Sequence, residues 1–377
     1  MLILGVFFIY TYSINNAIIH AAEDLSGVAE ELNIDIDEVT PRLDSDAEEF
    51  INQHEITIDN ADSMIKLSPL DLLSYAYDSF KSNLTLPLKT FTALLAVIFL
   101  SSLIEGLGDS SPNKHLSKTY GIIGVLVSVS VITKPVSEVI GSASSTITQG
   151  GTFMLTYIPV FAGLSASTGN ISSAMAYNMI VALAAQSAVQ LTSGILVPAL
   201  SVCMAIGIVG AVNPDFNLTG LTGSIKKATS FLLGFIMTIF IGLLSLQSIL
   251  GTSVDSLGLK AAKFIASNFV PVIGGAVADA YGTVRSSLGL LKSSVGFFGI
   301  LAIFFMVLPS IMLVISMRLV FSASEIIAEL FGVSRLKILF KNTADILGLM
   351  FSLLICFSIM FILSTAILML TGLSMYS

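Results

Sequence analysis

The stretch SSVGFFGILAIFFMVLPSIMLVISM, residues 293–317, contains no charged side chain. About 20 apolar residues in a helix cross the hydrocarbon layer of a bilayer, so this stretch predicts a transmembrane helix. Comparable apolar runs lie near residues 87–105, 119–134, 150–168, 171–193, 194–213, 228–250 and 345–371. The second run is short and the third to fifth are joined by brief turns. We therefore predict about eight spans, with six or seven as alternatives.

The composition of the whole chain agrees with this interpretation. Of its 377 residues, 54% are hydrophobic and only 11% are charged, and the mean hydropathy is +0.91. A soluble domain has about 25% charged residues. The composition therefore predicts an all-α, polytopic membrane protein whose first partner is the lipid bilayer. We expect no nucleic-acid partner.

The N-terminal part has a different character. Residues 23–81 contain 16 of the 25 acidic side chains and only three basic ones. We predict a signal peptide at 1–22, an acidic extracytoplasmic region of short amphipathic helices at 23–86, and a multi-span domain at 87–377. The apolar core at residues 2–10 is too short to cross a bilayer, as in a secretory signal. No basic residue precedes that core, and His20 stands near the cleavage position, so an uncleaved anchor and a misassigned start stay open.

The basic residues fix an orientation for these spans. Cytoplasmic loops of membrane proteins carry an excess of Lys and Arg. If the acidic region is outside, the residues that fall on the cytoplasmic side are Lys114, Lys118, Lys226, Lys227, Arg318, Arg335, Lys337 and Lys341. The exported N-terminal region and the charge bias thus predict the same topology, with both ends of the chain outside.

One segment, near residues 257–284, combines apolar residues with lysines and backbone breakers. It includes KAAKFIASNFVPVIGGAVAD, residues 260–279. Non-helical backbone at membrane depth needs protein or water around it, and polar groups there usually have a function. An interfacial helix followed by a loop and a re-entrant gating element are both open interpretations. The candidate residues are Lys260, Lys263, Asn268, Pro271, Gly274, Gly275 and Asp279.

A second candidate is a stripe of amides at intervals of four, formed by Asn178, Gln186 and Gln190 with Ala182 between them. Residues four apart share one face of a helix. Small and amide residues in membranes commonly mediate helix packing through interhelical hydrogen bonds. Lining a hydrated path is the alternative.

Sequence motifs of enzymes are missing. The chain contains no GxxxxGK[ST], HExxH or GxSxG motif, and these carry phosphate binding, zinc hydrolysis and nucleophilic catalysis. The acidic clusters at 35–38 and 44–49 lack the central glycine and terminal glutamate of an EF-hand loop. Cys203 and Cys356 lie in apolar runs and fit packed helices. We therefore expect no catalytic residue, cofactor or metal site.

The run LKAAKFIASNFVPVIGGAVADAYGTVRSSLGLLKSSVG, residues 259–296, resembles the hallmark region of the stage III sporulation protein AE family. The matching residues are Lys263-Phe264, the block Phe269–Gly274, Asp279, Leu290-Leu291-Lys292 and Val295-Gly296. The order of an exported acidic region and then several spans is also similar.

This resemblance implies a membrane subunit of a secretion-like channel between mother cell and forespore, needed for late forespore development. Its implied location is the mother-cell membrane that surrounds the forespore. Implied partners are other membrane and ring-forming proteins of the same operon, including a cytosolic secretion-type ATPase, and a forespore-side channel protein. A stand-alone small-molecule permease is the alternative function.

Overall fold

The computed structural model describes residues 45–54, 67–109, 114–213, 219–269 and 274–370. The predicted signal peptide and the acidic cluster at 35–38 lie outside these residues. The described part is helical, without strands. Its elements are α3 (Ser45–Gln53), α5 (Pro69–Ser82), α6 (Thr85–Asp109), α7 (Lys114–Ser167), α8 (Ile171–Leu191), the π-helical turn η3 (Thr192–Leu196), α9 (Val197–Val212), α10 (Thr219–Phe269), α11 (Gly274–Leu330) and α12 (Ser334–Leu370). The all-helical membrane fold is confirmed.

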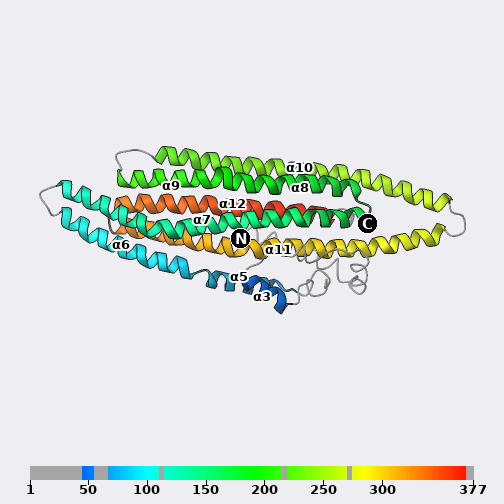
Figure 1. Cartoon of the computed structure of the whole chain (residues 1–377), viewed down its shortest axis with the longest axis horizontal. Helices are drawn as coiled ribbons and strands as arrows, with labels where there is room; N and C mark the ends of the chain where they lie inside the picture. Colours follow the sequence, from blue (N-terminus) through cyan, green and yellow to red (C-terminus); the bar gives the residue numbers. More distant parts are fainter. Residues whose placement is uncertain (1–44, 55–66, 110–113, 214–218, 270–273, 371–377) are drawn as a thin grey trace.

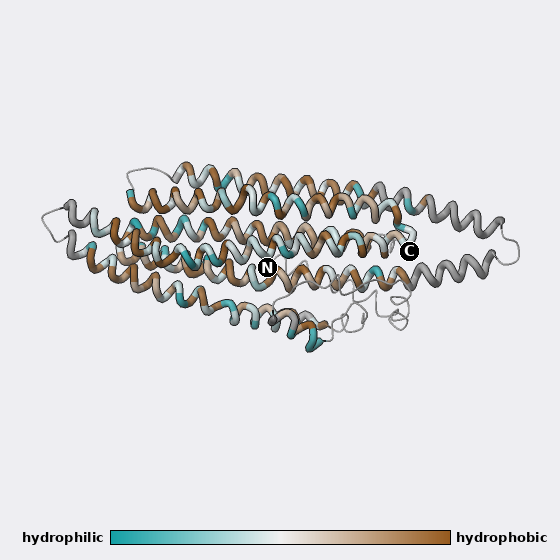
Figure 2. The backbone as a smooth tube through the Cα atoms, viewed as in Figure 1, coloured by the Kyte–Doolittle hydropathy of each residue, from teal (hydrophilic) through white to brown (hydrophobic). Residues whose placement is uncertain are grey.

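The long helices lie side by side along one axis and form an elongated rod (Figure 1). Helices α7, α10 and α11 contain 54, 51 and 57 residues. At a rise of 1.5 Å per residue, each is roughly 80 Å long, more than twice the thickness of the hydrocarbon layer. Apolar residues cover much of this length (Figure 2). The rod is therefore longer than one bilayer can enclose.

Within the described residues, six helical stretches are long and apolar enough to cross a membrane. The count corresponds to the six-span alternative, because two predicted breaks are absent. The runs 119–134 and 150–168 are parts of one helix, α7, and the runs 171–193 and 194–213 continue into each other through η3.

Continuity at both places has a local cause. Pro135 lies inside α7, where it removes one backbone hydrogen bond. Two residues earlier, the Thr133 hydroxyl donates to the Val129 carbonyl at 2.6 Å, which adds a bond to the same stretch. In η3, Thr192 donates to the carbonyl of Ala188 at 2.7 Å. Membrane helices tolerate proline where such side chains supply substitute hydrogen bonds.

Three connections lie at one end of the rod, which we call the basic end: α6 to α7, α9 to α10 and α11 to α12 (Figure 1). The basic residues predicted to be cytoplasmic lie on the helix segments near these connections. The turn at residues 168–170 lies at the opposite end. The eight-span prediction put that turn on the cytoplasmic side, at the basic end. Because α7 is one helix and not two spans, the turn lies at the other end of the rod.

Helix α7 is fixed to α11 by close packing. Tyr157 is fully buried, and its hydroxyl donates to the carbonyl of Val295 at 3.0 Å. Its ring stacks between those of Phe153 and Phe161, with ring centroids 5.4 Å apart in both pairs. A Cβ at Gly299 would lie 2.4 Å from the Tyr157 ring and hydroxyl, so glycine is needed at this contact.

The N-terminal helices α3 and α5 pack against the middle of α11. Rings of Phe50, Tyr75 and Phe305 form a cluster with centroid distances of 4.9–5.2 Å. Helix α5 begins with a capping box, in which Ser68 Oγ accepts from the Asp71 N–H and the Asp71 carboxylate accepts from the Ser68 N–H. The expected short amphipathic helices are present among the described residues of this region.

Candidate functional site: the polar face of α7

The predicted gating segment forms the far ends of α10 and α11. Lys260, Lys263 and Asn268 lie on α10, and Gly274, Gly275 and Asp279 lie on α11. Pro271 falls in 270–273, outside the described residues. The two helix ends extend past the ends of the other helices and lead away from the bundle (Figure 1). Their functional role stays a prediction.

The amide stripe of α8 shares one face, as its spacing indicates. Asn178 is half-buried, whereas Gln186 and Gln190 are exposed. The two glutamines make no hydrogen bond to a described residue. Close packing between α7 and α8 instead uses Gly151, where a Cβ would lie 2.5 Å from Val189. Packing within this chain is therefore not the role of the two glutamines.

The feature that sequence reasoning missed is the outer face of α7. From Ser130 to Ser167, polar or small residues recur at intervals of three and four, which places them on one helix face. All of them are exposed, and the face is roughly 55 Å long at 1.5 Å per residue, with the exposed apolar residues Leu155 and Pro159 interrupting it beyond Thr152. We call this the α7 polar face. Its members are Ser130, Thr133, Lys134, Ser137, Glu138, Gly141, Ser145, Thr148, Gln149, Thr152, Thr156, Gly163 and Ser167.

Hydrogen bonds within α7 satisfy most donors of this face. Thr148 and Thr152 each donate to the carbonyl four residues earlier, both at 3.0 Å. The Gln149 amide donates to the Ser145 hydroxyl at 3.1 Å, and Lys134 pairs with Glu138 at 3.8 Å. The remaining hydroxyl and amide oxygens point outward as acceptors. Such a surface is suited to contact with water.

The same side of the rod is apolar closer to the basic end. There α7 exposes Ile123, Leu126 and Val127, and α6 exposes Leu100 and Leu103. Charged residues lie at both ends of this apolar zone. They are Lys89 and Glu105 on α6, which are 16 positions apart, and Lys118 and Lys134 on α7, which are also 16 positions apart. Sixteen residues rise roughly 24 Å in a helix, close to the thickness of a hydrocarbon layer. The apolar zone thus matches one bilayer, and the polar face begins where it ends.

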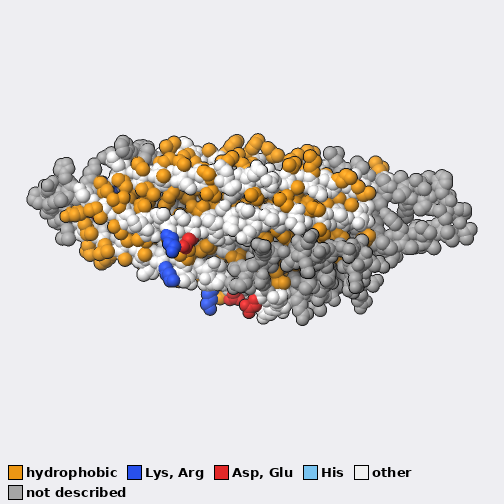
Figure 3. Space-filling view, in the orientation of Figure 1, with side chains coloured by type: hydrophobic (Ala, Val, Ile, Leu, Met, Phe, Trp, Pro, Cys, Tyr) orange, Lys and Arg blue, Asp and Glu red, His pale blue; other side chains and the backbone are white. Residues whose placement is uncertain are grey.

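Figure 3 shows this side of the molecule, with a few basic side chains close together on its lower half and with white, uncharged surface interspersed among apolar side chains. Lys81, Lys89 and Lys134 are the exposed lysines of α5, α6 and the described face of α7. Lysines of this kind commonly mark the boundary between lipid and water. Their position supports a bilayer surface at the start of the α7 polar face.

Acidic helices lie at the level of this face. A Cβ at Gly150 would lie 2.7 Å from Phe357 and 3.4 Å from the Met306 sulfur. Phe305, the residue before Met306, contacts Phe50 of α3 and Tyr75 of α5. We call this cross-section, from Gly150 and Gly151 through Met306 to α3 and α5, the mid-rod section. Helix α5 exposes Asp78 and α3 exposes Glu49, and α5 also exposes Leu70, Leu73 and Tyr77.

A cavity of about 320 Å³ lies between α7, α8, α10 and α12. Its walls are almost entirely apolar, with Ser187, Thr192 and Cys356 as the polar exceptions. It lacks the charged groups that a hydrated route for polar cargo needs. Among the described residues, no group of three or more His, Cys, Asp or Glu could hold a metal ion. The expected lack of cofactor and catalysis stays a prediction.

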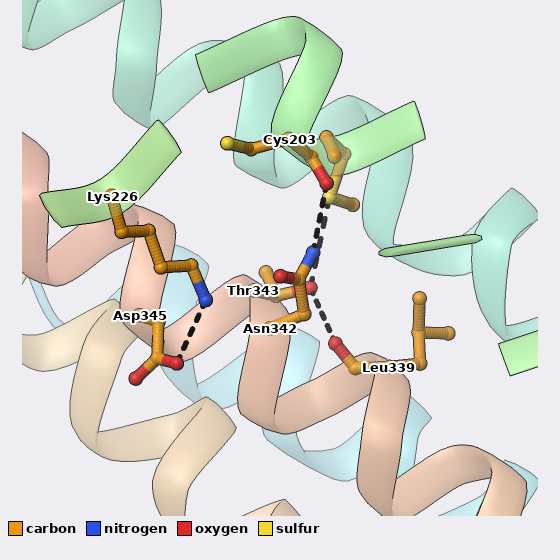
Figure 4. Close-up of polar contacts among 7 residues, drawn as sticks. Cys203, Lys226, Leu339, Asn342, Thr343 and Asp345 are labelled. Atoms are coloured by element: carbon orange, nitrogen blue, oxygen red, sulfur yellow. Dashed lines mark hydrogen bonds and ion pairs between the residues drawn. The ribbon is translucent and has the colours of Figure 1, made fainter. Parts of the chain in front are cut away.

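Polar contacts also join α9, α10 and α12 near the basic end (Figure 4). Asn342 of α12 donates to the Cys203 carbonyl of α9 at 3.1 Å, and Lys226 of α10 pairs with Asp345 of α12 at 2.8 Å. A Cβ at Gly207 would lie 1.8 Å from the Asn342 amide nitrogen, so this glycine leaves room for the first contact. These contacts hold the bundle together and leave the α7 polar face free.

The model of the family described as stage III sporulation protein AE (spore_III_AE) matches residues 52–372. The chain belongs to this family. The stage III sporulation protein AE of Bacillus subtilis (strain 168) is 26% identical over 213 residues, which are 56% of this chain and 52% of that protein. The match therefore spans about half the length of that relative. No solved structure matches the chain.

Membership in the stage III sporulation protein AE family confirms the resemblance seen in residues 259–296. It also assigns the chain a role in sporulation. Together with the six apolar helices, it identifies a multi-pass membrane protein.

Proposed function

We propose that this chain is a membrane subunit of a secretion-like channel between mother cell and forespore, and that the α7 polar face lines its water-filled path. The observation that carries the proposal is the polar face itself. It is roughly 55 Å long and exposed. Lipid is a poor neighbour for such a surface, because amides and hydroxyls lose hydrogen bonds to water there. The family and its role in sporulation support the cellular context.

The path proposed here is formed between chains. Each chain presents the polar face on its outside, whereas the half-open cavity between α7, α8, α10 and α12 is apolar. A stand-alone permease would need a polar site within its own bundle, near the bilayer midplane. The geometry thus favours the channel subunit. Its proposed location is the mother-cell membrane around the forespore, with the operon's other membrane and ring-forming proteins, a cytosolic ATPase and a forespore-side protein as partners.

Cysteine labelling tests the lining. In a background with Cys203 and Cys356 replaced by alanine, Thr148→Cys, Thr152→Cys and Thr156→Cys should react with a membrane-impermeant thiol reagent in sporulating cells. We expect labelling about tenfold faster than at Leu246→Cys on α10, because thiolate forms in water and not in lipid.

Two controls accompany this labelling experiment. Cys203 is buried and should stay unlabelled in the wild-type chain. The same three cysteines should lose reactivity when a bulky thiol reagent is added first from the extracytoplasmic side. Equal rates on α7 and at Leu246→Cys would show that lipid or protein covers the α7 polar face, and would overturn the proposal.

The tip of the α10–α11 hairpin offers a separate test of function. We expect Asp279→Ala and Pro271→Leu each to abolish late forespore development while the protein still inserts in the membrane. Spore yield and forespore reporter expression measure the effect, and membrane fractionation measures insertion. Asp78→Ala on α5 provides a control at another exposed acid. Wild-type spore yield from both tip variants would remove this segment from the mechanism.

A further inference from the structure

The turn between α7 and α8 contains several buried polar atoms without a hydrogen-bond partner. Within the described part of the chain, four such side-chain oxygens lie at this turn or against it: Ser165 Oγ, Asn170 Oδ1, Ser173 Oγ and Gln247 Oε1. The exposed fractions of the four residues are 0%, 2%, 0% and 6%. Buried polar atoms in native proteins nearly always have a partner. Four at one place therefore indicate a polar ligand.

Hydrogen bonds of the same residues place them around the start of α8. The Asn170 N–H donates to the Ser165 carbonyl at 3.2 Å, and its side-chain Nδ2 donates to the Thr168 hydroxyl at 2.8 Å. Gln247 of α10 donates from Nε2 to the Ser173 carbonyl at 2.9 Å. Positions 170 and 173 are three apart, which places their side chains within about 5–6 Å in a helical turn. The four unpartnered oxygens thus belong to one group.

Asp255 of α10 adds a negative charge to this group. Its carboxylate accepts from the N–H groups of Ser172 and Ser173 at 2.8 and 3.0 Å, and the residue is only 6% exposed. It forms no ion pair with a described Lys, Arg or His. A carboxylate has about four acceptor positions, so both oxygens can accept a further ligand.

The charge of Asp255 is not balanced by the two helix ends at the turn. The N-terminus of α8 carries roughly half a positive charge and the C-terminus of α7 roughly half a negative charge. Because both ends meet at residues 168–170, their effects largely offset each other. A buried charge is normally paired or bound to a metal ion. The amide oxygens of Asn170 and Gln247 can only accept, which also suits a positive ligand.

We propose that the α7–α8 turn binds a small monovalent metal cation, sodium or potassium, between the Asp255 carboxylate and the unpartnered oxygens. One carboxylate balances one positive charge, whereas calcium sites commonly use several carboxylates and magnesium keeps several waters. Oxygen ligands at helix ends also hold sodium in membrane transporters. The ion joins α10 to the start of α8 at the end of the rod opposite the basic end (Figure 1). The site does not depend on what the α7 polar face lines.

Thermal unfolding of the purified full-length protein in detergent tests this site. Sodium chloride and potassium chloride are each compared with choline chloride at equal ionic strength, so that screening is the same. In at least one of the two metal salts, the unfolding temperature should be about 5 °C higher than in choline chloride, because an ion that binds only the folded state stabilises it. Equal unfolding temperatures in all three salts would show that water alone meets these oxygens, and would overturn the proposal.

Asp255→Asn tests whether the response comes from this carboxylate. The change keeps the size of the side chain and one acceptor oxygen but removes the charge. The variant should unfold at the same temperature in the three salts. Asp78→Asn, at an exposed acid of α5, is the matched control and should keep the wild-type response. A full response in Asp255→Asn would place the ion elsewhere and reject the site.

Asn170→Asp gives a test that leaves Asp255 and its two hydrogen bonds in place. The change adds a second carboxylate, and two carboxylates favour a divalent ion. Calcium chloride should therefore raise the unfolding temperature of this variant by several degrees more than that of the wild-type chain. In the wild-type chain, sodium or potassium should also slow hydrogen exchange at the amides of residues 165–174. No gain with calcium, together with exchange that ignores the salt, would contradict an ion at this turn.

Discussion

Replacing Gly299 with valine should separate α7 from α11 and strongly lower the stability of the protein. A Cβ at this position would lie 2.4 Å from the ring and hydroxyl of Tyr157. Tyr157 cannot move aside easily, because it is fully buried and its hydroxyl is bonded to the Val295 carbonyl. Overpacking of this kind costs about 3 kcal/mol, and the extra methyl groups of valine increase the strain.

Thermal unfolding of the purified protein in detergent measures the loss, and the amount of protein in the membrane measures it in cells. Gly234→Val on α10 is the matched control, since a Cβ there meets nothing within 4 Å. The double variant Tyr157→Leu with Gly299→Ala should be more stable than Gly299→Val, because the smaller side chain at position 157 makes space for the added Cβ. If Gly299→Val unfolds at the same temperature as Gly234→Val, the contact between α7 and α11 is looser than described.

The fold class followed directly from the sequence, because uncharged runs such as 293–317 have few stable environments outside a membrane. The family followed from the residues of 259–296. The lengths of the helices did not follow. A window of hydropathy ends wherever charge appears, yet α7 continues through Lys134 and Glu138, whose side chains are exposed. A helix does not stop where the bilayer stops.

The α7 polar face was missed for the same reason. Residues 135–149 were interpreted as a connection between two spans, so their spacing was not examined as one helix face. The signal was present in the hydroxyl and glycine residues that recur from Ser130 to Ser167. For α8, spacing put Gln186 and Gln190 on one face correctly. Whether that face points into the bundle depends on tertiary packing, which a helical period alone does not define.

Contacts between distant segments were also beyond the sequence. Asn170 precedes α8, but its side chain makes no capping hydrogen bond. Asp255 of α10 caps the helix instead: its carboxylate oxygens accept from the N–H groups of Ser172 and Ser173 at 2.8 and 3.0 Å. One helix thus supplies the cap of another more than 80 residues away, and capping patterns read from local sequence cannot detect it.

Asp255→Ala should therefore release the start of α8 from α10. Asp255 is only 6% exposed, so its loss leaves the N–H groups of the half-buried Ser172 and the buried Ser173 without these acceptors and removes a negative charge from a helix N-terminus. Hydrogen bonds to a charged group contribute about 1.5–3 kcal/mol each, so we expect a loss of about 3 kcal/mol or more. Asp255→Asn, which keeps one acceptor oxygen, should lose roughly half as much.

Hydrogen exchange at the amides of Ser172 and Ser173 locates this effect. Both amides should exchange faster in Asp255→Ala, whereas Asp78→Ala, at an exposed acid of α5, should leave them unchanged. Gln247 of α10 also donates to the Ser173 carbonyl at 2.9 Å. The loss of stability in Asp255→Ala with Gln247→Leu should therefore be smaller than the sum of the losses in the two single variants, because both contacts join the same two helices. Unchanged exchange in Asp255→Ala would mean that the carboxylate does not hold α8 to α10, and the stability of this end would have to come from apolar packing alone.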